Sequence, residues 1–153
     1  MKKNLLIPAF LVCLLVSISA SAQLTGTLTV PSTAYPDLAT VITALNTQGV
    51  GAGGATINIA SGNAQTAPAG GYVLGSAILN ASLSAANPVT IQGHGNTVTA
   101  YTGTGTIDGI FELTGADYVT IDSLNLQESA ANTTATTQME WGYALLKLNN
   151  TLL

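Results

Sequence analysis

Charged residues are scarce in this chain. Asp, Glu, Lys and Arg make up 7% of its 153 residues, arginine is absent, and the formal net charge is −4. Proteins that bind nucleic acid rely on clustered Lys and Arg to contact the phosphates. The composition therefore argues against a nucleic-acid partner.

The sequence also has a single cysteine, Cys13, which lies in an apolar stretch near the N-terminus. Two lysines precede this stretch, residues 5–16, and small residues follow it as far as Ala22, before Gln23. A basic start, an apolar run and small residues are typical of a secretory signal peptide, and the run is shorter than the roughly 20 residues of a membrane span. We expect residues 1–22 to be removed during export across the inner membrane, leaving no membrane span.

The predicted mature chain has no cysteine, so no disulfide can stabilise a small core. It must bury enough apolar surface by itself or through further repeats. One basic residue, Lys147, stands against seven acidic ones, so the net charge becomes 1 − 7 = −6 with His94 neutral. Regularly placed aliphatic residues nevertheless predict a folded protein rather than a polar linker.

Two local patterns follow the predicted signal peptide. Apolar residues alternate with threonine from Leu24 to Val30, which predicts a strand within residues 23–34. Within residues 35–48 the apolar residues recur at helical spacing, at Leu38, Val41, Ile42 and Leu45. Asp37 suits the positive end of that helix and Gly49 its C-terminal cap. We expect the helix to lie across an end of the sheet and to cover strand edges.

A repeat of about 30 residues dominates the rest of the chain. A threonine is followed by an aliphatic residue at Thr56, Thr90, Thr120 and Thr151, which are separated by 34, 30 and 31 residues. Such spacing indicates stacked units that cannot bury their apolar face alone. In strands stacked about 4.8 Å apart, the isoleucines would form an interior ladder and the threonines an outward one. The outward neighbours of Asp122 would then be Gln92 and Asn58.

Each repeat contains a second apolar stretch, in residues 77–83, 110–113 and 144–148, which we interpret as a second strand. Turn formers lie between the stretches. The fourth copy stops at Leu153, soon after its threonine. We therefore expect an all-β solenoid whose coils, residues 49–153, are truncated at the C-terminus and leave an open edge.

Two segments carry a family resemblance: residues 35–59, YPDLATVITALNTQGVGAGGATINI, and residues 116–126, ADYVTIDSLNL. They resemble the N-terminal part of right-handed parallel β-helix proteins of the pectin lyase-like type. The later segment, together with residues 139–144, also resembles the opening of large secreted proteins exported by the type IX route in Gram-negative bacteria. The resemblance implies a right-handed parallel β-helix with a capping helix, followed by further coils and a sorting domain.

Recognisable cofactor chemistry is missing from the sequence. Gly49-x-Gly51-x-x-Gly54 has the spacing of a dinucleotide motif, but it follows the predicted helix instead of opening one, so we interpret it as a flexible turn. His94, flanked by glycines, is interpreted as a turn residue because one imidazole without partner ligands makes no zinc site. We predict no metal and no cofactor.

No catalytic residues can be assigned. Glycosidase carboxyl groups lie roughly 5 to 10 Å apart, whereas Asp122 and Glu128 on one strand would be about 20 Å apart. Four residues bracket a Thr-rich stretch that could form a sugar-binding loop, namely Glu128, Glu140, Trp141 and Tyr143. The alternative, which we favour for Trp141, is a buried packing residue at a coil corner.

These observations predict a secreted or cell-surface module without catalysis in the visible chain. Its role would be structural, adhesive or carbohydrate-binding, with polysaccharides or cell-surface glycans as partners. The alternative is the N-terminal part of a polysaccharide lyase or glycoside hydrolase whose catalytic coils lie beyond Leu153. A third hypothesis is a self-sufficient small binding domain.

Overall fold

The protein consists mainly of parallel β-strands. A computed structural model describes residues 22–104 and 108–148. Within these residues the larger sheet contains β1 (Leu24–Val30), β2 (Val50–Ile59), β5 (Val89–Thr99), β7 (Val119–Gln127) and the short β3 (Gln65–Thr66). The smaller sheet contains β4 (Tyr72–Leu74), β6 (Gly109–Thr114) and β8 (Trp141–Leu146). All of the strand pairs in both sheets are parallel, which confirms the all-β class.

The predicted first strand and helix are both present. β1 has the predicted bounds, and α1 spans Leu38–Gln48. Asp37 is extended and its side chain accepts a hydrogen bond from the backbone N–H of Thr40, so the helix begins after it. Gly49 ends the helix at φ +74°, a conformation that favours glycine. The four residues predicted to form the apolar face are all buried.

One predicted strand is wrong. Residues 77–83 were expected to form a strand, but α2 occupies Ala77–Ser82 and the strand β4 lies earlier in the chain. The hydroxyl of Ser76 accepts a hydrogen bond from the N–H of Leu79 and caps the helix. Most of the segment consists of good or neutral helix formers, so the cap decides the local structure.

The Gly49–Gly54 segment is not a turn either. Gly49 is the helix cap, but the glycines after it lie inside β2, where the pairing with β1 shifts from Leu24 opposite Val50 to Gly26 opposite Ala55. A Cβ atom at Gly54 would lie 2.3 Å from the carbonyl oxygen of Pro88. The glycines therefore allow a bulge and a close backbone approach.

The predicted ladders are confirmed by the strand register. Ile57 pairs with Ile91, and Ile91 pairs with Ile121, in line through β2, β5 and β7. Thr56, Thr90 and Thr120 are aligned in the same way on the opposite face. Ile57 and Ile91 are fully buried, whereas Ile121 is partly exposed because no described strand pairs with the far edge of β7.

Asparagine side chains join successive layers of strands. They donate hydrogen bonds to backbone carbonyl groups about 30 residues away, from Asn46 to Val73, Asn80 to Thr114, Asn96 to Ala60, Asn125 to Gly95 and Asn132 to Tyr101. Four of these carbonyl groups lie at strand ends or in the bulge of β5, and that of Val73 lies on the edge strand β4, so the side chains bond to groups that the strand ladders leave unpaired. They tie each layer to the next.

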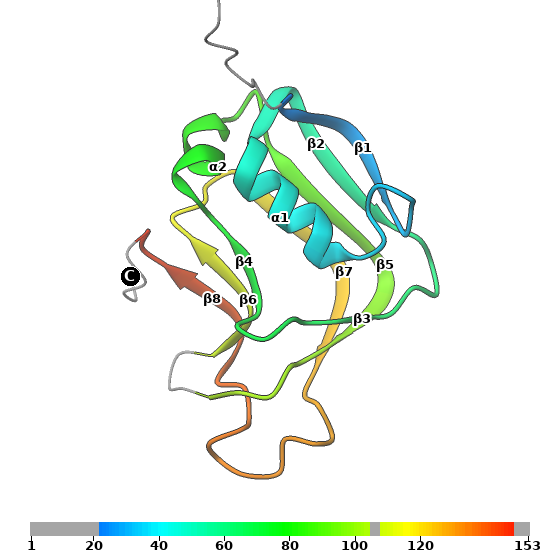
Figure 1. Ribbon diagram of the computed structural model, residues 1–153, viewed down its shortest axis with the longest axis vertical. Coiled ribbons are helices and arrows are strands. Elements are labelled where there is room, and N and C mark those ends of the chain that lie inside the picture. The colour runs from blue at the N-terminus through cyan, green and yellow to red at the C-terminus, as the bar shows by residue number, and fades with distance from the viewer. Residues whose placement is uncertain (1–21, 105–107, 149–153) are drawn as a thin grey trace, which may run out of the picture.

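The helix α1 closes one end of this arrangement, as predicted. Figure 1 shows α1 between β1 and β4, the edge strands of the two sheets. Its buried residues complete the core on this side, and the side chain of Asn46 bonds to the backbone of Val73 and Gly75 beside β4. The opposite end, formed by β7 and β8, has no such cover among the described residues. No helix in the described part of the chain is long and apolar enough to cross a membrane.

Candidate functional site

The outer face of the larger sheet carries two polar rows. Each row takes one side chain from β1, β2, β5 and β7 in turn. The first row is Thr27, Thr56, Thr90 and Thr120, and the second is Thr29, Asn58, Gln92 and Asp122. Neighbours within a row are about 4.8 Å apart, and the rows are about 7 Å apart. We call these eight residues the polar face.

All eight residues of the polar face are at least partly exposed. The residues from β1 and β7 are the most exposed, and those from β2 and β5 are intermediate. Hydroxyl and amide groups can both donate and accept hydrogen bonds, so seven of the eight positions can bond in either direction to a hydroxyl-rich ligand, and Asp122 can accept. The face carries one charge, the Asp122 carboxylate, at the β7 end.

A bend beyond the second row adds two further polar groups. His94 has φ +50°, and its Nε2 atom lies 2.7 Å from Oδ1 of Asn58, on the neighbouring strand. Ser123 has φ +55°, and its hydroxyl donates to the carboxylate of Asp122 at 2.9 Å. The position of His94 was predicted to be a turn, but it lies inside β5 and contacts the polar face. In the sequence, the glycines on both sides of His94 are the feature that could have indicated a bulge.

Glu128, one of the predicted binding residues, holds a loop closed. Its carboxylate accepts hydrogen bonds from the backbone N–H groups of Ser129 and Met139 and from the side chain of Asn132. Partial desolvation raises the pKa of Glu128, but these three hydrogen bonds outweigh it and the pKa lies below its ordinary value. The Glu128 carboxylate therefore has a structural partner on each oxygen.

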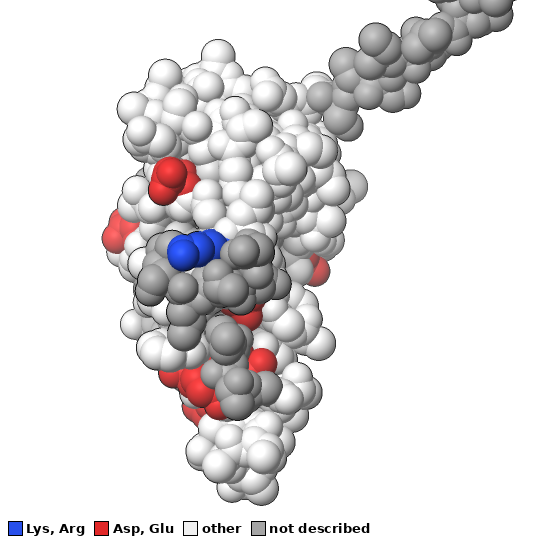
Figure 2. Space-filling model, turned by 90° about the vertical axis from the view of Figure 1, so that its left-hand side faces the viewer, with Lys and Arg blue, Asp and Glu red and all other residues white. Residues whose placement is uncertain are grey.

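Glu140 lies at the other end of the same loop, near two further acids. Its carboxylate accepts a hydrogen bond from the N–H of Asp108 at 3.2 Å. Burial, followed by the charges of Asp108, Glu112 and Glu140, raises the pKa of Tyr101 to about 12, so these groups share one region. Figure 2 shows acidic side chains gathered in the lower part of the left-hand face, while most of that surface is uncharged.

The predicted burial of Trp141 at a corner is wrong. Trp141 is 43% exposed and Tyr143 is 45% exposed, and both lie on β8. The ring of Tyr143 stacks on Phe111 at 5.6 Å between centroids, and Phe111 contacts Tyr72 at 5.0 Å. These residues line up as the interior ladder of the smaller sheet. Trp141 and Tyr143 are exposed because β8 is the last described strand of that ladder.

The structure thus separates the four predicted binding residues by role. Glu128 and Glu140 bond to loop backbone, whereas Trp141 and Tyr143 lie on a strand at the uncovered end. In the described residues no group of three His, Cys, Asp or Glu side chains is placed to hold a metal ion.

Comparison of the chain with protein-family models, curated proteins and solved structures finds no match.

Proposed function

We propose that this chain is an exported module built from the capped first coils of a right-handed parallel β-helix, with a structural and adhesive role at the cell surface or outside the cell. The parallel pairing of strands about 30 residues apart supports the coil arrangement. The leader-like N-terminus supports export. The fold by itself is compatible with many activities, so the function must come from a surface.

The polar face is the surface that supports this role, and its ligand is a neutral polysaccharide. The single observation that carries the proposal is the alignment of the two polar rows across four consecutive strands. A regular grid of hydroxyl and amide groups can form repeated hydrogen bonds with the hydroxyl groups of an extended sugar chain. The Asp122 carboxylate at one end disfavours an acidic polymer.

The experiment measures binding of the exported chain to insoluble cellulose, insoluble chitin and soluble polygalacturonate. We expect saturable binding to cellulose or chitin and none to polygalacturonate. The double variant Thr56→Val/Thr90→Val removes two hydroxyl groups but keeps the β-branched shape. Each lost hydrogen bond contributes about 0.5–1.5 kcal/mol, so affinity should fall about tenfold.

The matched control is Thr102→Val/Thr133→Val, which removes two hydroxyl groups from exposed positions outside the sheets. It should bind like the unaltered chain. Equal binding by both double variants, or no binding to any neutral polymer, would refute the role of the polar face. Release of soluble sugar products from these polymers would instead favour an enzyme.

A further inference from the structure

The uncovered end of the molecule, which we call the tail, combines two free strand edges with apolar side chains. No described strand pairs with the outer edge of β7 or of β8. Between these strands lies a hollow of about 270 Å³, lined by Leu113, Val119, Ile121, Tyr143 and Leu145. Leu145 is 58% exposed although it lies in line with the buried Leu74 and the partly buried Leu113. Apolar surface next to free strand edges is a site for strand addition.

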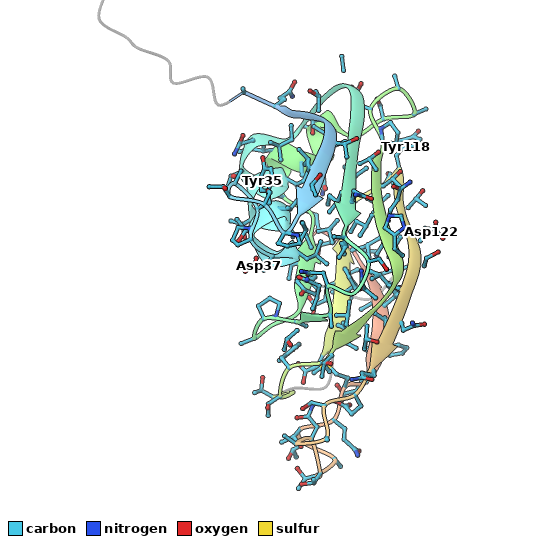
Figure 3. The ribbon with its side chains drawn as sticks, turned by 90° about the vertical axis from the view of Figure 1, so that its right-hand side faces the viewer. Tyr35, Asp37, Tyr118 and Asp122 are labelled. Carbon is cyan, nitrogen blue, oxygen red and sulfur yellow. The ribbon has the colours of Figure 1, made fainter. Side chains whose placement is uncertain are left out.

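The opposite end, which we call the head, consists of β1 and the outer face of α1. No described strand pairs with the outer edge of β1. The outer face of α1 carries a shallow hollow of about 470 Å³, lined by Asp37, Ala39, Thr40, Thr43, Ala44, Thr47 and Gln48. Apart from Asp37 these side chains are uncharged, and most are small. Figure 3 shows Asp37 and Tyr35 at the head and Tyr118 and Asp122 at the tail, on opposite sides of the stacked strands.

The strand at the head matches the strand at the tail in pattern and direction. β1 pairs in parallel with β2, with Thr27 beside Thr56 and Leu28 beside Ile57. β7 pairs in parallel with β5 in the same register, with Thr120 beside Thr90 and Ile121 beside Ile91. A β1 strand placed next to β7 would therefore put threonine beside threonine and leucine beside isoleucine.

We propose that the tail binds the head of a second copy of this chain. β1 of the second copy pairs in parallel with β7, with its Thr27 beside Thr120 and its Leu28 beside Ile121. This contact joins two different surfaces, so it leaves a free head and a free tail and builds an open filament. A tail-to-tail dimer would instead require antiparallel pairing, which occurs in neither sheet.

When β1 of the second copy pairs with β7, the smaller sheet also meets a surface that it can pack against, the outer face of α1. α1 lies beside β4, because Asn46 bonds to Val73 and Gly75, and β8 follows β4 and β6 in line. A shift along the stack that places β1 next to β7 therefore places α1 next to β8. The exposed Tyr143 and Leu145 of one copy then pack on the small residues of α1 in the next. The filament also continues the polar face from copy to copy, although assembly does not depend on sugar binding.

The test measures the size of the exported chain by sedimentation and electron microscopy over a range of concentrations. Leu145→Lys blocks the tail, Thr43→Lys blocks the head, and Ser61→Lys is the matched control in an exposed turn. We expect the unaltered chain and the control to form filaments whose length increases with concentration. Each blocked variant should remain a monomer with an unchanged circular dichroism spectrum.

A mixture of the two blocked variants separates this proposal from other forms of self-association. One intact tail and one intact head remain in the mixture, so species of two chains in a 1:1 ratio should form and growth should stop there. An unaltered chain that is still monomeric at about 100 µM, roughly 100 times a dissociation constant of about 1 µM, would overturn the proposal. A closed dimer of the unaltered chain, or no heterodimer in the mixture, would overturn it as well.

Discussion

The side chain of Asn46 on α1 occupies the place of a neighbouring strand beside Val73. Its Nδ2 atom donates to the carbonyl oxygen of Val73 at 2.7 Å, and its Oδ1 atom accepts from the N–H of Gly75 at 3.0 Å. A strand added to that edge would form the same pair of bonds with the backbone. The helix therefore closes the β4 edge with polar groups as well as with apolar packing.

Replacement of Asn46 should destabilise the protein. Asn46→Ala leaves the carbonyl of Val73 and the N–H of Gly75 without these partners, and we expect the free energy of unfolding to fall by about 1–3 kcal/mol. Urea unfolding of dilute protein measures the change. Thr43→Ala, an exposed position on the same helix, should change it by less than about 0.5 kcal/mol. Equal stability of the two variants would contradict this role of Asn46.

The isoleucines of the interior ladder should contribute unequally to the stability of the fold. Ile91 is fully buried between two neighbours, so Ile91→Ala should lower the free energy of unfolding by about 2–5 kcal/mol. Ile121 is partly exposed at the tail, and Ile121→Ala should have a smaller effect. Urea unfolding at concentrations where the chain is monomeric compares them. Equal losses would mean that the tail is covered in the monomer.

Acid should open the loop between Glu128 and Met139. The pKa of Glu128 lies below its ordinary value of about 4.3 in the folded chain, so its stabilising contribution is complete above that value and is lost as the pH falls through the folded pKa. Amide exchange measured by NMR at pH 6 and at pH 2 should show protection of Ser129 and Met139 that is weaker at the lower pH. Glu128→Gln should show weak protection at both pH values, and an unchanged pH dependence would contradict the assignment.

The contribution of Glu112 to stability should change with pH in the opposite direction to that of Glu128. Burial, opposed by a hydrogen bond from Gly109 and reinforced by Asp108, raises the pKa of Glu112. The folded state therefore favours the protonated acid, and its contribution to stability is lost as the pH rises through the folded pKa. Glu112→Gln should raise the thermal midpoint at pH 7 on the order of 2 °C and leave it unchanged at pH 4. An equal rise at both pH values would indicate a packing effect.

Much of the fold could be predicted from local periodicity. The alternation in residues 24–30, the helical spacing in residues 38–45 and the repeated Thr-Ile pairs all correspond to observed elements. These patterns succeed because each strand or helix must bury one face, and that requirement is written into consecutive residues. The strand predicted in residues 77–83 is wrong because the capping serine, Ser76, outweighs an apolar run of ambiguous period and starts a helix.

The candidate site was less predictable, because polar side chains are shared between local and long-range partners. Glu128 is a candidate binding residue in the sequence because it borders the Thr-rich stretch, but backbone groups of its own loop bond to its carboxylate. His94 was assigned to a turn, although it contacts Asn58, 36 residues earlier. No spacing rule specifies which carbonyl or amide group is left without a partner until the layers are stacked.

The sequence by itself determined the repeated strands β1, β2, β5 and β7, the capping helix and the order of residues in the ladders of the larger sheet. The tertiary structure decided which members of those ladders are covered. Ile91 and Ile121 occupy the same position in their repeats, yet one is buried and the other borders the tail. The physical reason is that burial of a stacked strand depends on a neighbour on each side, and the repeat alone does not show which strand is the last.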